Sequence, residues 1–211
     1  MNTKAIWTIL VFLSCSLITA CAVPESVHPL SPPDEAVADP RLDGAWAGIH
    51  PDGTTDGSLH MYIQSADSGL MDVVLVILDD EILETLRYEA HVTPADNTRY
   101  VNARFKFLAA PEGAGGKVDI EDSEWRIADR YLFAKYSFSD DGLLHVWFLH
   151  DSDTLADAIR SGELKSEETG GSLCGGSETL ITDEPEWILK FLEAHDHDEI
   201  FGGPTVFRRL G

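Results

Sequence analysis

The chain has 211 residues, and its 37 Asp and Glu residues outnumber its 15 Lys and Arg residues, so its formal net charge at pH 7 is −22. Such an acidic surface repels the phosphates of nucleic acids and anionic lipid headgroups, which excludes electrostatic binding to either. A chain of this length buries a substantial core without disulfides. These properties predict one acidic globular domain that binds no nucleic acid.

The first 20 residues have the organisation of an export signal. Lys4 supplies a positive charge, and a short apolar run from Ala5 to Leu13 follows it. A membrane-spanning helix needs about 20 consecutive apolar residues, whereas this run is interrupted at Ser14. We therefore expect residues 1–20 to be a cleaved signal peptide and not a permanent transmembrane helix.

Residues 18–21, Ile-Thr-Ala-Cys, resemble the lipobox of bacterial lipoproteins, where a branched apolar residue and two small ones precede a cysteine. The resemblance implies cleavage before Cys21, a diacylglyceryl group on its thiol and, usually, acylation of the new amino terminus. Cys15 fits less well, because Phe12 stands where the family has a branched aliphatic residue. Two or more acyl chains anchor a protein stably. The alternative is an ordinary secretory signal with a chance cysteine.

Position 22 is alanine and not aspartate. In a host with two membranes, the lipoprotein pattern then implies the periplasmic face of the outer membrane. We therefore expect a protein of the cell envelope that is attached to the membrane through the lipid at Cys21. Cys174 is the one cysteine left for the mature chain, because Cys15 is removed and Cys21 is acylated, so no intrachain disulfide is expected.

Residues 21–40 contain five prolines and no periodic apolar pattern, which predicts a semi-extended tether with polyproline character. From residue 41 to residue 211, alternation of apolar and polar residues dominates, as in half-buried strands. This region is expected to form one β-rich domain. The segments expected to be strands are residues 44–50, 59–65, 72–78, 87–93, 101–107, 131–138, 143–150 and 205–210.

Two of these segments carry further signals. Residues 73–78 are apolar throughout, which predicts a strand that is covered on both faces. Asp141-Gly142 lies between two alternating segments, and this dipeptide favours a tight hairpin turn.

Two helices are expected late in the chain. Ser152 or Asp153 caps the first, and Gly162 ends it. Asp183 is the expected N-cap of the second, ahead of a proline near its first turn. The Gly/Ser-rich residues 166–178 form a loop between them. The fold class is therefore mainly β, an antiparallel barrel or strongly curved sheet of about eight strands with two late helices.

The first expected strand begins with Gly44-x-Trp46. This resembles the opening Gly-x-Trp signature of lipocalins and related calycin barrels. The resemblance implies that Trp46 closes the base of a barrel and that an arginine from late in the chain packs across it. Arg208 or Arg209 fits that role, and we take Arg208 with Gly44 and Trp46 as the signature. A generic barrel or sandwich is the alternative.

The segment that most resembles a metal-binding site is residues 193–199, Glu-Ala-His-Asp-His-Asp-Glu. His195 and His197 supply imidazole ligands suited to Zn²⁺ or Ni²⁺, with carboxylates beside them. The simpler interpretation is a solvated helix end with His195 near the helix dipole. Cys174 is a candidate nucleophile, but no basic residue stands close in sequence to lower its pKa. We predict no cofactor.

An eight-stranded barrel either fills its interior with side chains or leaves room for one small ligand. We expect a lipid-anchored, non-enzymatic module that binds a small apolar ligand or another envelope protein, with Trp46 closing one end. One alternative is a lipid-anchored hydrolase or metal-dependent enzyme that uses Cys174 or the segment with His195 and His197. The other is a structural or assembly role without a ligand.

Overall fold

The computed structural model describes residues 23–79, 82–95, 98–109, 130–170, 177–195 and 197–211. Eight antiparallel strands form a closed barrel, and each corresponds to one of the eight alternating segments of the sequence, so the expected fold class is confirmed. The barrel strands are β2 (Gly44–Ile49), β3 (Thr55–Ser65), β4 (Met71–Asp79), β5 (Ile82–Ala95), β6 (Thr98–Ala109), β7 (Tyr131–Phe138), β8 (Leu144–Phe148) and β11 (Thr205–Arg209).

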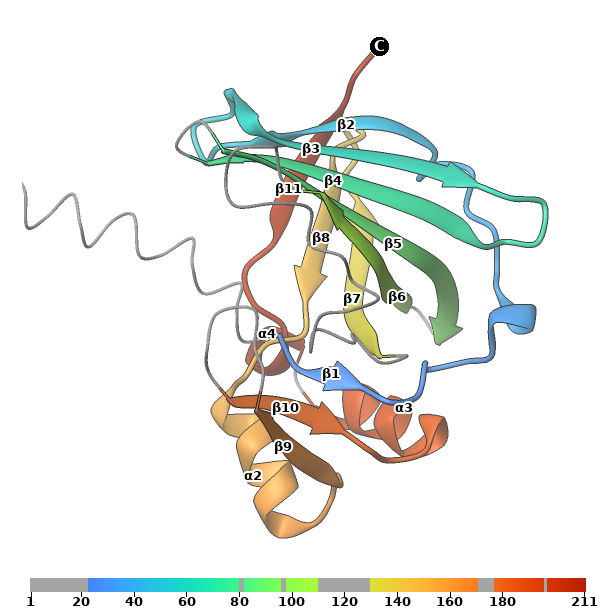
Figure 1. Cartoon of the computed structure of the whole chain (residues 1–211), viewed down its shortest axis with the longest axis vertical. Helices are drawn as coiled ribbons and strands as arrows, with labels where there is room; N and C mark the ends of the chain where they lie inside the picture. Colours follow the sequence, from blue (N-terminus) through green and yellow to red (C-terminus); the bar gives the residue numbers. More distant parts are fainter. Residues whose placement is uncertain (1–22, 80–81, 96–97, 110–129, 171–176, 196) are drawn as a thin grey trace, which may run out of the picture.

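The barrel is an up-and-down meander in which strands that follow one another in the chain lie side by side. β2 to β8 succeed one another around the wall, and β11 closes it by pairing with both β8 and β2. The turn from β7 to β8 is the expected hairpin, because Gly142 has a φ of 80° and donates its N–H to the Ser139 carbonyl at 2.9 Å. In Figure 1 the segment inserted between β8 and β11 lies below the barrel.

This inserted segment contains both late helices that the sequence predicts. Its elements are α2 (Asp153–Ser161), β9 (Ser166–Gly170), β10 (Ser177–Ile181), α3 (Pro185–Ala194) and α4 (His197–Ile200). Ser152 caps α2 by accepting the N–H of Leu155 at 3.2 Å, and Gly162 ends it with a φ of 80°. Residues 166–178 are not a plain loop, because their two ends pair as β9 and β10. Residues 171–176 lie outside the described part of the chain.

The start of α3 differs from the expectation. Its N-cap is Glu184, and no side chain caps it. Asp183 is instead buried and accepts hydrogen bonds from the backbone N–H and the ammonium group of Lys165, at 2.7 and 2.9 Å. Pro185, whose φ is fixed by its ring, is the first residue of the helix. The Asp183 carboxylate does not cap the helix, because it is bound to Lys165. No helix in the described ranges is both long and apolar enough to cross a membrane.

Apolar side chains form two clusters, one on each side of the barrel wall. The inner cluster surrounds Trp46 and includes Met61 and Phe207. The outer cluster joins Tyr100 of β6 and Phe133 of β7 to the inserted segment through Leu149, Leu155, Ala158, Leu164, Ile181, Ile188, Phe191, Leu192, Ile200 and Phe201. Because side chains alternate across a strand, β6 and β7 are therefore covered on both faces.

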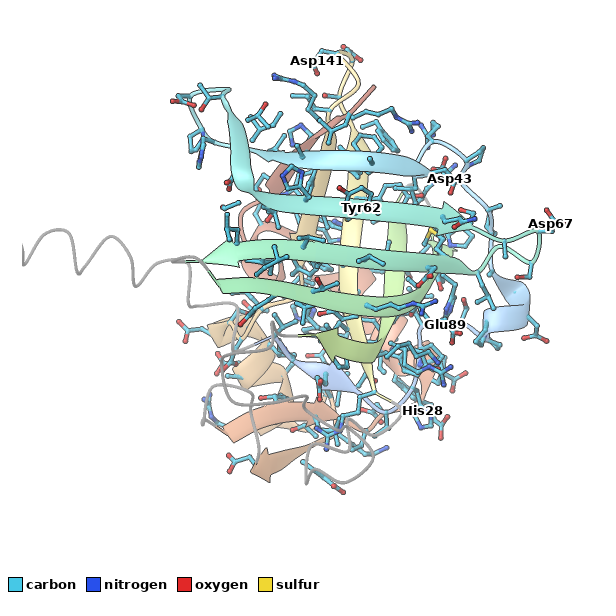
Figure 2. The ribbon with its side chains drawn as sticks, turned by 45° about the horizontal axis from the view of Figure 1, so that its top comes forward. His28, Asp43, Tyr62, Asp67, Glu89 and Asp141 are labelled. Carbon is cyan, nitrogen blue, oxygen red and sulfur yellow. The ribbon has the colours of Figure 1, made fainter. Side chains whose placement is uncertain are left out.

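β4 has a less covered outer face than its apolar sequence predicts. Leu78 is 45% exposed, and its partner Leu83 on β5 is 47% exposed. Tyr62, on the outer face of β3 in Figure 2, is 47% exposed and stands opposite Val74. The expectation of burial on both faces is therefore wrong for β4. The inserted segment is packed on β6 and β7, so it does not cover this side of the wall.

Residues 23–40, which the sequence assigns to a tether, pack against the barrel as what we call the N-terminal strap. Its strand β1 (Glu25–Ser26) pairs antiparallel with the start of β7 and parallel with β10. The short 3-10 helix η2 (Pro33–Glu35) follows. Leu30 is only 4% exposed. The prolines keep the strap extended. Its apolar side chains pack on the domain and its backbone amides form hydrogen bonds with it, so this region is not a free tether.

Polar side chains on the outer face of β5 and β6 hold the strap. Asn102, fully buried, accepts the N–H of Leu30 at 2.6 Å and donates to Thr93 Oγ1 at 2.8 Å. His91 Nε2 donates to the Ser31 carbonyl at 2.8 Å, and burial lowers the pKa of this imidazole. The strap is therefore attached by buried hydrogen bonds as well as by apolar contact.

We expect Asn102→Ala to lower the free energy of unfolding by about 2 kcal/mol, because it leaves the buried Leu30 N–H without its acceptor. Urea unfolding followed by circular dichroism measures this change. Gln64→Ala is the matched control, since Gln64 is an exposed amide on β3, and should change the stability by less than about 0.5 kcal/mol. Equal effects of the two substitutions would contradict the role assigned to Asn102.

Candidate functional site

One end of the barrel is sealed by Trp46, which is 1% exposed. Its Nε1–H donates to the Leu42 carbonyl at 2.8 Å, and the guanidinium carbon of Arg209 lies 4.7 Å from the centre of its ring. Arg209 also donates a hydrogen bond to the Arg41 carbonyl. Gly44 has a φ of 131°, and a Cβ there would lie 3.3 Å from Arg209 Nη1, so glycine leaves room for the guanidinium. We call this the sealed end.

Arg208, the arginine taken from the sequence as part of the signature, does not occupy this position. Arg209 is the β11 residue that pairs with Trp46. Successive residues of a strand point to opposite faces, so Arg208 points outward, where it donates to the Gly53 carbonyl at 3.5 Å. Of the two arginines that the sequence leaves open, Arg209 is therefore the one that packs on the tryptophan.

A buried carboxylate, which sequence reasoning missed, reinforces the sealed end. Asp39 is 3% exposed and binds Arg41 through both oxygens, at 2.9 and 2.7 Å. Arg99 Nη1 and the Tyr136 hydroxyl donate to the same carboxylate at 2.6 and 2.9 Å. The hydrogen bond from Arg41 is the largest cause that lowers the pKa of Asp39 to about 2. The charge of Asp39 is thus compensated by Arg41, which directly follows the strap, and by groups from β6 and β7.

The exposure of inward-facing side chains changes along the barrel axis. Near Trp46 they are buried, as in Met61, Ile63, Met71, Ala90, Val92, Leu144 and Phe207. Towards the other end they are only partly buried, as in Leu59, Val73, Leu75, Leu86, Phe105, Leu132 and Val146, and Phe148 is 38% exposed. We call the part of the barrel interior that these partly buried apolar side chains line the cup.

We call the end of the barrel that contains Leu59, Leu132 and Phe148 the mouth. The strand ladders place it at the start of β3 and β7 and at the end of β8. The inserted segment leaves the barrel at the mouth and returns there, because it connects the end of β8 with the start of β11. Among the described residues, the inward-facing apolar side chains are thus deeply buried at the sealed end and only partly buried at the mouth.

Tyr88 provides a polar group inside the cup. It pairs with Val73 of β4, and its ring meets Phe105 edge-on with centroids 5.4 Å apart. Burial raises the pKa of Tyr88 to about 12, and the nearby Glu25 carboxylate adds to this shift. The neutral hydroxyl has no hydrogen-bond partner among the described residues, so it is available to donate to or accept from a ligand.

A partly buried ion pair lies at the mouth. Arg130 Nη1 is 2.8 Å from a Glu25 oxygen, and the two side chains are 21% and 18% exposed. Glu25 stands opposite Leu132 in the ladder between β1 and β7, and cross-strand partners share one face of a sheet. The Glu25 side chain is therefore on the inner side of the wall, next to Tyr88.

Two hollows on the outer surface differ from the cup in chemistry. One of about 580 Å³ lies over β3 to β6 and is lined by Asp72, Arg87, Glu89 and Lys106, among others. These charges pair with one another, at 2.7 Å for Asp72 with Arg87 and 3.3 Å for Glu89 with Lys106. The other, of about 310 Å³, lies beside α3 at Trp187. Charged side chains line part of each hollow, unlike the apolar interior of the barrel.

The structure does not bring the imidazoles of His195 and His197 together as metal ligands. His195 Nδ1 donates to the Phe191 carbonyl at 3.0 Å. His197 Nε2 lies 3.1 Å from the hydroxyl of Tyr100, in the outer cluster. Within the described ranges, no three His, Cys, Asp or Glu side chains are grouped so that they would hold a metal ion. His195 therefore bonds within the inserted segment, whereas His197 joins that segment to β6.

Cys21 and Cys174 lie outside the described residues, so the structure assigns no surroundings to either thiol. Comparison of the chain with models of protein families, with curated proteins and with solved structures gives no match.

Sequence reasoning had a signal for part of this site. Alternation places Tyr88 on one face with Ala90 and Val92 and thereby predicts the shared inward face. No local pattern marks Asp39 or Glu25, because their partners are distant in the chain.

We expect Asp39→Asn to lower the free energy of unfolding at pH 7 by about 2 to 3 kcal/mol, since one pKa unit corresponds to about 1.4 kcal/mol. The folded pKa of about 2 lies below the ordinary 3.8. The stabilisation is therefore complete above about pH 4 and is lost as the pH falls through 2. Urea unfolding at pH 7, 4 and 2 should show the difference between the two proteins narrowing with acidity.

The control for this experiment is Asp67→Asn, an exposed carboxylate in the turn between β3 and β4 (Figure 2). It should leave the stability unchanged at each pH. A wild-type advantage over Asp39→Asn that stays constant down to pH 2 would show that the charge of Asp39 is not what stabilises the sealed end.

We expect Arg209→Ala to destabilise the protein by about 1 to 2 kcal/mol, through the lost cation–π contact with Trp46 and the lost hydrogen bond to Arg41. Arg208→Ala removes the same charge from the adjacent position and should cost less than about 0.5 kcal/mol. Thermal unfolding of both variants at equal ionic strength measures the difference. A larger loss for Arg208→Ala would contradict the assignment of Arg209.

Proposed function

We propose that this protein is a lipid-anchored, non-enzymatic binding protein of the bacterial cell envelope, which holds a small apolar ligand in the cup. The observation that carries the proposal is the partial exposure of inward-facing apolar residues towards the mouth. An eight-stranded barrel is the size at which one small ligand fits inside. Side chains that remain wetted inside the barrel favour a ligand space over a completely filled core.

The chemistry of the cup favours an apolar ligand with one polar group. Burying apolar surface contributes about 25 cal/mol per Å², so covering about 200 Å² of ligand and wall contributes about 5 kcal/mol before the costs of binding. Tyr88 offers one neutral hydrogen-bonding hydroxyl within these walls. Small-molecule sites commonly combine apolar walls with a few polar groups that orient the ligand.

We further propose that the barrel is lipocalin-like. The Gly44-x-Trp46 pattern supports this, and so does the position of Arg209 across the indole. The segment inserted before β11 and the missing Thr-Asp-x-Tyr motif are departures from the family pattern.

The membrane anchor in this proposal is a lipid on Cys21. The lipobox-like residues 18–21 and the preceding apolar run support it. Several acyl chains anchor a protein stably without help from surface charge, which suits a chain with a net charge of −22. Alanine at position 22 favours the periplasmic face of the outer membrane as the location.

A second candidate function is binding of another envelope protein through the outer face of β3 to β5. The exposure of Tyr62, Leu78 and Leu83 favours it, because neighbouring large apolar side chains are seldom left exposed without a use. The alternatives of a metal-dependent enzyme and of a hydrolase with Cys174 gain no support from the described residues. His195 and His197 each bond to a different neighbour.

We expect the purified domain, residues 22–211, to bind the neutral dye N-phenylnaphthylamine with an increase in dye fluorescence. Val73→Trp places a large side chain in the cup and should weaken binding at least tenfold. Val74→Trp makes the same change at the neighbouring position, which points outward, and should leave the affinity unchanged. Equal affinities of the two variants would rule out the cup as the dye site.

Circular dichroism and thermal unfolding establish that both variants are folded. If Val73→Trp does not fold, Leu75→Phe provides a smaller inward change with the same expected direction. Native mass spectrometry of the same protein, before and after denaturation, identifies a ligand that co-purifies. An additional non-covalent mass of a few hundred daltons is the expected result for an occupied cup.

A further inference from the structure

The hollow of about 310 Å³ beside α3 lies on the surface of the inserted segment, which packs on the outer side of β6 and β7 (Figure 1). Gly162, which ends α2, and the residues that follow it form one side. Trp187, Lys190 and Phe191 of α3 form the other side. Their spacing of three and four residues places these side chains on one face of the helix. The hollow is therefore separate from the interior of the barrel.

Trp187 presents an aromatic surface to solvent at this hollow. Its side chain is 48% exposed, whereas Phe191, one helical turn further on, is 2% exposed and lies at the base of the hollow. The ammonium group of Lys190 lies 4.8 Å from the centre of the Trp187 ring, and a cation in this position covers only one ring face. A large part of the indole is therefore accessible to a ligand that enters the hollow.

Buried contacts fix the base and one side of the hollow. The buried carboxylate of Asp183 accepts hydrogen bonds from the backbone N–H and the ammonium group of Lys165 at 2.7 and 2.9 Å. The hydrogen bond to Asp183 raises the pKa of Lys165, so this group stays charged. The ring of Phe191 packs against His195 with centroids 4.5 Å apart. The hollow is therefore preformed, which lowers the cost of ordering its side chains around a ligand.

The charged side chains at the rim offer both kinds of hydrogen-bonding group. Lys165 and Lys190 only donate, and the carboxylate of Glu163 only accepts. The Lys165 side chain is 76% exposed and uses one of its three ammonium hydrogens on Asp183. Glu163 is 47% exposed and lies 3.9 Å from His195 Nε2, which is too far for a hydrogen bond. Donors and an acceptor thus surround the indole with capacity left for a ligand.

The charges of the hollow exclude several classes of ligand. An anion meets Glu163 and Asp183 as well as the net charge of −22, which repel it. A cation is repelled by Lys165 and Lys190 at the rim. A wholly aromatic ligand would take these charged groups out of water without giving them partners. A sugar ring fits, because it has C–H groups on its faces and hydroxyls around its edge, and each hydroxyl both donates and accepts.

We infer that the hollow beside α3 is a binding site for a neutral oligosaccharide, one ring of which stacks on Trp187 while its hydroxyls bond to the charged groups at the rim. The volume of about 310 Å³ lies at the lower end of the range for small-molecule sites. One ring therefore occupies the hollow, and the rest of the oligosaccharide extends along the exposed surface. This site goes beyond the proposed function, because it depends neither on the cup nor on a lipid at Cys21.

Two neutral trisaccharides, cellotriose and triacetylchitotriose, test this inference with residues 22–211. The equatorial substituents of their rings leave C–H groups on both ring faces. Mannitol is the control ligand, because it has hydroxyls but no ring face. Saturation-transfer difference NMR should show transfer from the protein to the ring C–H protons of at least one trisaccharide and none to mannitol. Transfer to mannitol as strong as to the trisaccharides would overturn the inference, and so would the absence of transfer to all three.

Variants of α3 locate the binding. Trp187→Ala removes the stacking surface and should weaken binding at least tenfold, whereas Trp187→Phe keeps an aromatic face and should stay within about threefold of the wild type. Glu186→Ala changes an exposed neighbour that does not line the hollow and should leave the affinity unchanged. Chemical-shift titration of ¹⁵N-labelled protein measures the affinities, and circular dichroism establishes folding. Equal affinities of Trp187→Ala and the wild type would overturn the inference.

A competition experiment separates this site from the cup. Saturating the protein with N-phenylnaphthylamine should leave the affinity for the trisaccharide unchanged, because the two ligands occupy different places. Displacement of the trisaccharide by the dye would overturn the assignment of the two separate sites. Trisaccharide binding that depends on Trp187, in a protein that does not bind the dye, would support this inference while the proposed function fails.

Discussion

The sealed end of the barrel is the constraint on which the rest of the structure depends. Asp39 gathers two guanidinium groups and the hydroxyl of Tyr136 around one buried carboxylate, and Trp46 fills the space beside them. Removing either arginine would leave the charge of the buried carboxylate less well compensated, which is more costly than losing a surface ion pair. This end of the barrel is therefore closed by directional contacts between distant parts of the chain.

The two apolar clusters have different roles, because one stabilises the fold and the other lines the interior of the barrel. The outer cluster is almost completely buried and joins the inserted segment to β6 and β7. It supplies packing that does not depend on how the interior of the barrel is filled. The barrel is therefore free to keep partly exposed side chains near its mouth. Proteins commonly combine a well-packed region with a less stable binding region in this way.

The N-terminal strap links the fold to the proposed anchoring. Its prolines are typical of extended segments, yet Leu30 and Asn102 fix it to the wall by a buried contact and a hydrogen bond. A proline-rich segment thus serves as part of the domain surface, because extended backbone also fits along a sheet. The strap therefore begins two residues after Cys21, the proposed site of the lipid.

The sequence by itself determined the local features of this protein. The patterns of apolar residues identified all eight barrel strands, and alternation placed Tyr88 with its inward neighbours. The signals at Ser152, Gly142 and Gly162 located a helix and a turn. These features depend on backbone geometry within a few residues, which neighbouring side chains control.

Only the tertiary structure decided which faces are covered and which distant groups meet. Alternation fixes the face on which a side chain lies but not the element that packs there, so β4 has exposed outer residues while β7 is buried on both sides. Asp39 meets Arg99, 60 positions later, and Arg209, not Arg208, meets Trp46. Such contacts arise from closure of the whole barrel, which no short stretch of sequence contains.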